Sequence, residues 1–351
     1  MFFFSEYLSY KPSGYKNYYY CDYKDEITKK IIFHFNLFLE SSLGGQKCPC
    51  QVLFFYNMSN QKALGQISYL IQLLTDRDKF VRQKVRTQLI ELGEDALPFL
   101  EMAVRSEEVS LRVQAQEVIS AIFPEKLGEK FRQLAQKGMG RDVDLEAGML
   151  LIMEFGYPDS NPQSCKENLD SLAHRLEQNL TPDADPSQTV FALTRLLFQQ
   201  ENFKGNKENY MEPDNTYLNK VLDHKTGLPI TLSALCILIA GRLGLPIVGV
   251  GMPGHYIAKY NLPKDPIYFD PFNQGRLLTH ADCVQIVEQF GQPFEEHFLS
   301  QSTNRETLIR MMNNLIQVYR EFNEPEKAET LSGYIKILLD PSKNPFTRKT
   351  R

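Results

Sequence analysis

One stretch of the sequence has residue types and spacing that could carry acid–base chemistry. Residues 227–260 read GLPITLSALCILIAGRLGLPIVGVGMPGHYIAKY, and the phrase YFDPF follows at residues 268–272. In such an arrangement His255 could act as a base and Asp270 could orient its ring, provided that a nucleophilic side chain lies beside them. The first question for this sequence is therefore which side chain would attack.

The elements that must position these residues can be predicted from local patterns. Pro229 suits the first turn of a helix, where its missing N–H has no partner to lose, and Gly241 and Gly244 predict the end of that helix. A β-branched run then predicts a buried strand, a second strand opens at His255, and a third ends at Asp270. A helix whose N-terminus faces the first residues of neighbouring strands would bring a nucleophile, a histidine and a carboxylate together.

The same elements resemble a known family. The motifs YLNKVLDHKTGLPITLS, RLGLPIVGVGMPGHYIAKY and YFDPFNQGRLL occur in this order, and the order is similar to that of the transglutaminase-like core, which is related to papain-like thiol enzymes. The closer resemblance is to the SirB branch of that superfamily, and it covers residues 142–290. It implies an α+β fold, predominantly helical, with a long helix packed on a small antiparallel sheet.

The resemblance also assigns positions to a catalytic triad. In active members the nucleophilic cysteine lies two residues after the glycine that opens the helix; this glycine matches Gly227, so the cysteine's place falls on Pro229, which has no nucleophilic group. His255 and Asp270 match the base and its orienting carboxylate. The resemblance thus implies a core that retains two members of the triad and lacks the attacking atom.

Two nearby side chains offer alternatives. Thr231 lies two residues beyond Pro229, so its hydroxyl could face His255 as a nucleophile, or it could satisfy a backbone N–H of the first helical turn. Cys236 lies about two helical turns beyond Pro229, and we expect it to be a small core residue. His255 and Asp270 could equally form a hydrogen-bonded pair that serves only the fold.

The rest of the chain divides into flanking segments. Residues 1–57 form an aromatic N-terminal extension, and one hypothesis is that Met58 is the natural start. Residues 58–123 contain two segments, FVRQKVRTQLIEL and SLRVQAQEVISAI, that align at a separation of 30 residues and resemble HEAT-type helical repeats. Residues 124–300 hold the transglutaminase-like domain. Residues 301–351 predict two helices and a short turn, which resemble a tetratricopeptide-type (TPR-like) hairpin.

Composition limits the partners and the location. The net charge of −4 provides no basic face for nucleic acid. No segment has the pattern of a secretory signal or the roughly 20 apolar residues that span a bilayer, so we expect a cytoplasmic protein without a membrane partner. The six cysteines show no repeated metal-ligand spacing, so no metal and no cofactor are expected.

These observations lead to a predicted function with an alternative. The prediction is a cytoplasmic, SirB-type transglutaminase-like protein that lacks the catalytic cysteine and binds a protein or peptide partner. The alternative is an acyl-transfer or amide-hydrolysing enzyme in which Thr231 or a residue outside the motif attacks, His255 acts as base and Asp270 orients it. A third hypothesis is a scaffold in which the flanking helices only stabilise the core.

Overall fold

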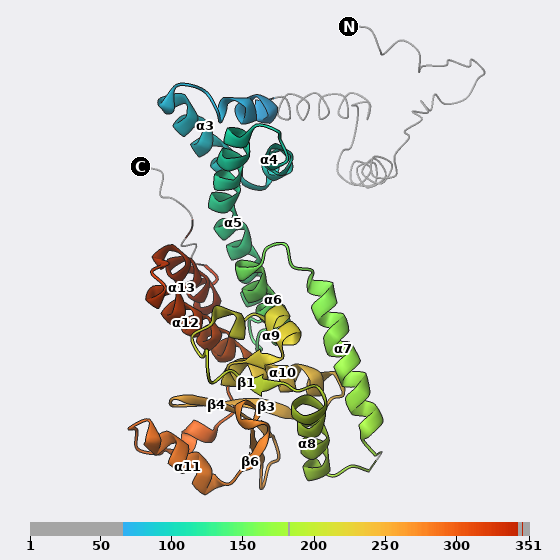
Figure 1. Cartoon of the computed structure of the whole chain (residues 1–351). Helices are drawn as coiled ribbons and strands as arrows, with labels where there is room; N and C mark the ends of the chain where they lie inside the picture. Colours follow the sequence, from blue (N-terminus) through green and yellow to red (C-terminus); the bar gives the residue numbers. More distant parts are fainter. Residues whose placement is uncertain (1–65, 182, 343–345, 347–351) are drawn as a thin grey trace, which may run out of the picture. The chain divides into compact units, whose positions relative to one another are not determined.

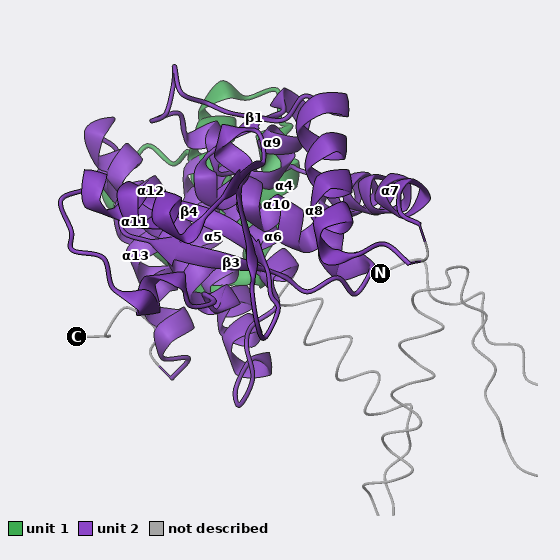
Figure 2. Ribbon diagram, turned by 90° about the horizontal axis from the view of Figure 1, so that it is seen from below, with its two compact units in different colours: residues 1–116 green, residues 117–351 purple. Residues whose placement is uncertain are grey.

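The structure, a computed structural model, describes residues 66–181, 183–342 and 346. The predicted N-terminal extension, residues 1–57, and the hypothesis about Met58 lie outside these residues. The chain divides into two compact units, residues 1–116 and 117–351, which are coloured green and purple in Figure 2. The candidate site belongs to the second unit.

The first unit contains the first segment of the predicted helical repeat and the start of the second, which continues past residue 116. Its described part comprises helical residues 66–73, α3 (Lys79–Leu92), a 3₁₀ turn (Gly93–Asp95), α4 (Leu97–Val104) and the start of α5 (Val109–Lys137). Arg82 and Arg112, which the 30-residue alignment matches, make equivalent contacts. Each donates Nη1 to the carbonyl oxygens six and five residues earlier, at 2.7 and 3.1 Å for Arg82 and at 2.9 and 2.9 Å for Arg112. The two aligned segments therefore begin with the same local structure, and the HEAT assignment stays a prediction.

The second unit holds the remaining elements (Figure 1). Its helices are α6 (Leu145–Gly156), α7 (Pro162–Asn179), α8 (Pro186–Thr194), a π-helical turn (Arg195–Gln200), α9 (Leu218–His224), α10 (Pro229–Arg242), α11 (His280–Gln289), α12 (Asn304–Glu321) and α13 (Pro325–Leu339). Its strands are β1 (Lys204–Gly205), β2 (Thr226–Gly227), β3 (Ile247–Met252), β4 (His255–Tyr260), β5 (Ile267–Asp270) and β6 (Arg276–Leu278). The 3₁₀ helices are η3 (Pro213–Asn215), η4 (Pro271–Asn273) and η5 (Glu296–Leu299).

The elements predicted around the candidate site are confirmed. Helix α10 begins at Pro229, strand β4 begins at His255, and strand β5 ends at Asp270. Further upstream, α5 continues through Pro124. The predicted domain boundary between residues 123 and 124 therefore falls inside a helix, and the domain division itself stays a prediction.

The sheet is small and antiparallel, as predicted. Its strand order is β3-β4-β5-β6, while β1 and β2 form a separate parallel pair. Side chains alternate between the two faces of β4: Tyr256 and Ala258 join the large core that contains α10, and Ile257 joins a smaller core with Cys283 and Val287 of α11. Helices thus cover both faces of the sheet, and its strand ends carry the candidate residues.

The C-terminal helices form the predicted hairpin, with Asn323 in a left-handed conformation (φ 58°) at the turn. The hairpin is part of the same core as α10: Leu308, Met311 and Leu331 are buried in it. The ring of Tyr334 on α13 also stacks on Phe131 of α5 at a centroid distance of 4.7 Å. The helical hairpin is confirmed, and its tetratricopeptide assignment stays a prediction.

Within residues 66–181, 183–342 and 346, no helix combines the length and the apolar character that crossing a membrane requires.

Candidate functional site

His255 and Asp270 form a hydrogen-bonded pair, with 2.8 Å between His255 Nε2 and Asp270 Oδ2. The antiparallel pairing of β4 and β5 explains their proximity, because the start of β4 lies beside the end of β5. Both side chains are largely buried, with 12% of His255 and 3% of Asp270 exposed. The structure therefore brings together the two residues that the sequence places 15 positions apart.

The Asp270 carboxylate is saturated with hydrogen bonds. Oδ2 also accepts from Asn273 Nδ2 at 2.8 Å, and Oδ1 accepts from the backbone N–H groups of Phe272 and Asn273 at 3.0 and 3.3 Å. Burial alone would raise the pKa of Asp270, but the hydrogen bonds from His255 and Asn273 outweigh it and hold the pKa below its ordinary value. Asp270 is therefore an ionised carboxylate that can orient the histidine and stabilise its protonated form.

Three further side chains support the pair, and the sequence analysis did not identify them. Lys207 Nζ donates to Asn273 Oδ1 at 2.7 Å, which extends the chain of hydrogen bonds from His255 through Asp270 to Lys207. The ring of Phe272 meets His255 edge-on at a centroid distance of 6.2 Å. Of the three, only Asn273 could have been predicted from the local sequence. Asp270 and Pro271 favour a tight turn, and such a turn brings the residue three positions after Asp270 back to its carboxylate.

The expected position of the nucleophile is occupied by Pro229, which is buried in the first turn of α10. Thr231 is fully buried in the same turn. Its Oγ1 has no hydrogen-bond partner in the part of the chain that the structure describes, so no bond joins it to His255. The structure thus brings His255 and Asp270 together and leaves the hydroxyl of Thr231 apart from them.

The described cysteines are buried free thiols. Burial raises the pKa of Cys165 and of Cys283 to about 11, and it raises the pKa of Cys236 further because that residue is fully enclosed. Since the thiolate is the reactive form, these residues are unreactive at neutral pH. Cys236 is a core residue, as expected.

A cleft of about 480 Å³ lies beside the pair, lined by β1, by the segment after it and by η4. Gly205 makes this arrangement possible, because a Cβ on it would lie 2.4 Å from the ring of Phe272 and 2.6 Å from its carbonyl oxygen. Lys204 and Lys207 contribute positive charge to the lining, and Asn273 connects the cleft to Asp270. Its volume lies within the range of ligand-binding clefts.

Within the described ranges, no three His, Cys, Asp or Glu side chains gather as a metal site would require. The candidate site consists of one acid–base pair, its hydrogen-bonded supports and the adjoining cleft. The pair can hold the histidine ring in one orientation, and the position that the resemblance assigns to the nucleophile holds Pro229.

Comparison with known proteins agrees with this description. The sequence model of the Transglutaminase-like superfamily matches residues 163–313, so the chain carries a transglutaminase-like domain. A UPF0162 protein of Xylella fastidiosa (strain 9a5c) is 31% identical over 203 residues, which are 56% of this chain and 72% of the relative. This chain belongs to the UPF0162 protein family.

Two further relatives show how widely the domain is shared. F-box only protein 21 of Homo sapiens is 31% identical over 161 residues, 44% of this chain and 25% of that protein. A UPF0162 protein of Vibrio cholerae (serotype O1, strain ATCC 39315 / El Tor Inaba N16961) is 27% identical over 150 residues, 42% of this chain and 56% of the relative. No solved structure was found to match.

Proposed function

We propose that this protein is a cytoplasmic, SirB-type member of the transglutaminase-like superfamily that binds a protein or peptide without catalysing acyl transfer. One observation carries the proposal: His255 and Asp270 are hydrogen bonded at 2.8 Å, while Pro229 begins the helix from which a nucleophile would be expected. This combination supports a core that keeps the base and its orienting carboxylate and lacks a side chain that could attack.

The cleft beside Asp270 supports a binding role. Lys204, Lys207 and the acidic Glu208 line it, so positive charge exceeds negative by one, and neither lysine forms an ion pair within the described part of the chain. Unpaired ammonium groups on the wall of a cleft favour a ligand with acidic side chains. We therefore expect the preferred partner segment to be an acidic peptide.

The alternative is an acyl-transfer or amide-hydrolysing enzyme in which Thr231 attacks, His255 acts as base and Asp270 orients it. A general base must approach the proton that it removes to within hydrogen-bond reach. The hydroxyl of Thr231 is fully buried without such a contact. This hypothesis therefore has less support than binding.

An array of immobilised acidic, neutral and basic peptides tests the proposal. We expect selective capture of acidic peptides, at least about tenfold weaker capture by Lys207→Ala, and unchanged capture by Lys264→Ala, which removes an exposed lysine outside the cleft. The same samples are assayed for ammonia release from a glutamine-containing peptide. Turnover that disappears in His255→Ala would establish the enzyme instead.

A further inference from the structure

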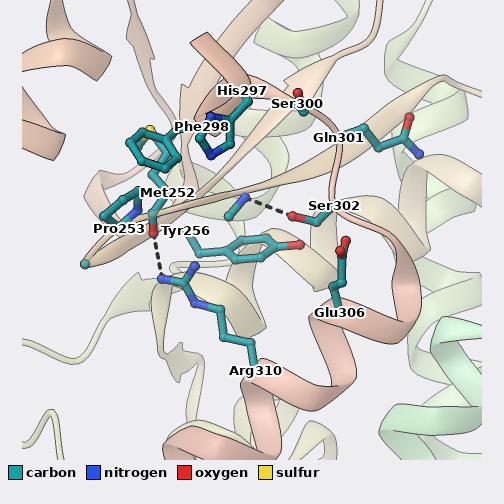
Figure 3. Close-up of a pocket in the computed structure, with 12 residues that line it drawn as sticks. Met252, Pro253, Tyr256, His297, Phe298, Ser300, Gln301, Ser302, Glu306 and Arg310 are labelled. Carbon is teal, nitrogen blue, oxygen red and sulfur yellow. Dashed lines mark hydrogen bonds between the residues drawn. The ribbon is translucent and has the colours of Figure 1, made fainter. Parts of the chain in front are cut away.

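A second cleft, of about 690 Å³, lies at the β3–β4 turn. Figure 3 shows it between that turn, residues 297–302 and helix α12, with Arg310 and Tyr256 at its base. None of the residues that line the cleft beside Asp270 lines this one. The second cleft is therefore a separate place at which a ligand could bind.

Arg310 has guanidinium N–H groups in this cleft that lack acceptors among the described residues. Its Nη2 donates to the carbonyl oxygens of Met252 and His255, both at 2.9 Å. Neither Nη1 nor Nε has an acceptor among the described residues, and no described carboxylate pairs with the guanidinium. Burial lowers the pKa of Arg310, and the ring of Tyr256, 5.5 Å from the guanidinium carbon, compensates for only part of the lost solvation. An anion in the cleft would compensate for that lost solvation.

The space for such an anion lies over Gly251. A Cβ placed on Gly251 would lie 3.0 Å from Ser302 Oγ and 3.2 Å from Arg310 Nη1, with the Tyr256 ring 3.6 Å away. Ser302 Oγ accepts from the backbone N–H of Gly251 at 3.0 Å, and its hydroxyl also hydrogen bonds to the side chain of Tyr256, so Ser302 already has partners. A side chain at position 251 would therefore crowd Arg310 Nη1, whereas glycine leaves this N–H group accessible from the cleft.

The charges around the cleft select the kind of anion. Glu306, the one acidic residue in the lining, accepts from the backbone N–H and the hydroxyl of Thr303 at 2.8 and 3.0 Å, and so caps α12. A carboxylate adds one negative charge beside Glu306, whereas a phosphate dianion adds two and is repelled more strongly. A carboxylate therefore fits the cleft better than a phosphate does.

We propose that this second cleft binds the carboxylate of a small acid or of a peptide C-terminus beside Gly251, with Arg310 Nη1 as the donor. The proposal does not depend on peptide binding beside Asp270. The apolar wall formed by Pro253 and Phe298 would contact the rest of the ligand.

Titration of the full chain by NMR tests the proposal with three probes: hexanoate, the peptide acetyl-Ala-Ala-Phe with a free C-terminus, and the same peptide as its C-terminal amide. Both carboxylates are expected to shift the backbone signals of Gly251 and Ser302 with dissociation constants of about 1 mM or below. The amide is expected to bind at least about tenfold more weakly. A peptide acid that binds much more tightly than hexanoate would identify a peptide C-terminus as the source; equal affinities would identify a small acid.

Variants then locate the carboxylate. Gly251→Ala fills the space over Gly251 and leaves Arg310 in place, so carboxylate affinity is expected to fall at least about tenfold. Arg310→Met should do the same, whereas Arg320→Met, on an exposed residue of the same helix, should bind as the wild type does. Because Arg310 also holds the β3–β4 turn, Gly251→Ala is the deciding variant if Arg310→Met does not fold. Equal binding of acid and amide, or unchanged affinity in a folded Gly251→Ala, overturns the proposal.

Discussion

At the scale of single residues, the Asp270 carboxylate determines what the site can do. Its pKa is held below the ordinary value of 3.8, so ionised Asp270 stabilises the folded state above that pH, and this contribution is lost as the pH falls below 3.8. We expect Asp270→Asn to lower the free energy of unfolding by about 1 to 3 kcal/mol at neutral pH. The difference from the wild type should shrink below pH 3.8. Denaturant unfolding at a series of pH values measures it, with the exposed Asp159→Asn as control.

Two buried threonines provide a matched comparison. Thr307 Oγ1 hydrogen bonds to Tyr256 Oη at 2.7 Å and to the carbonyl oxygen of Thr303 at 2.9 Å, whereas Thr231 Oγ1 has no described partner. We expect Thr231→Val to raise the free energy of unfolding by about 1 kcal/mol and Thr307→Val to lower it by about 1 to 3 kcal/mol. Urea unfolding distinguishes them. An equal loss in both variants would mean that the Thr231 hydroxyl has a partner after all.

At the scale of elements, two helical glycines differ in how closely other side chains approach them. A Cβ on Gly148 of α6 would lie 2.2 Å from Leu308 of α12, while a Cβ on Gly241 of α10 would meet nothing within 4 Å. Gly148→Ala should therefore lower the free energy of unfolding by about 1 to 3 kcal/mol, and Gly241→Ala should raise it by about 0.5 kcal/mol. Thermal unfolding measures both. A stabilised Gly148→Ala would contradict the close approach of α6 and α12.

A cysteine at the start of α10 tests whether His255 faces the position that the resemblance assigns to the nucleophile. A thiol introduced by Pro229→Cys would lie at a helix N-terminus. If the resemblance assigns the nucleophile's position correctly, this thiol would face His255 and its pKa should fall. Its alkylation at pH 7 should then be about tenfold faster than that of an ordinary thiol. Peptide mapping after brief iodoacetamide treatment measures labelling at position 229 separately from the native cysteines. The double variant Pro229→Cys/His255→Ala should lose the enhancement. An unreactive thiol at position 229 would count against a transglutaminase-like arrangement of these residues.

At the scale of the whole molecule, the C-terminal hairpin and the transglutaminase-like domain share one core. Tyr319 on α12 hydrogen bonds to Tyr217 at 2.5 Å between the two hydroxyl oxygens, and Arg310 holds the β3–β4 turn. A chain that ends at residue 300 should therefore expose the buried faces of α6 and α10 and fail to fold. Circular dichroism and limited proteolysis measure this outcome. A cooperatively folded truncation would show instead that residues 301–351 form an independent domain.

The local part of this organisation was predictable from the sequence. The proline at the start of α10, the glycines near its end and the alternation along β4 are short-range signals, because helix caps and side-chain periodicity depend only on neighbouring residues. The resemblance carried by three ordered motifs added His255 and Asp270 as partners, and antiparallel pairing of β4 and β5 places them 2.8 Å apart.

The long-range hydrogen bonds, the buried hydroxyl and the clefts depend on tertiary packing and could not be predicted from local sequence patterns. Lys207 reaches Asn273 across 66 positions, and Arg310 reaches the backbone of His255 across 55, so both contacts exist only once separate elements have packed together. The same packing encloses the Thr231 hydroxyl and opens the space over Gly251. By itself the sequence determined which elements form and which two residues could do proton chemistry. The tertiary structure decided their supports and clefts, because burial and long-range hydrogen bonds depend on how the elements fill space.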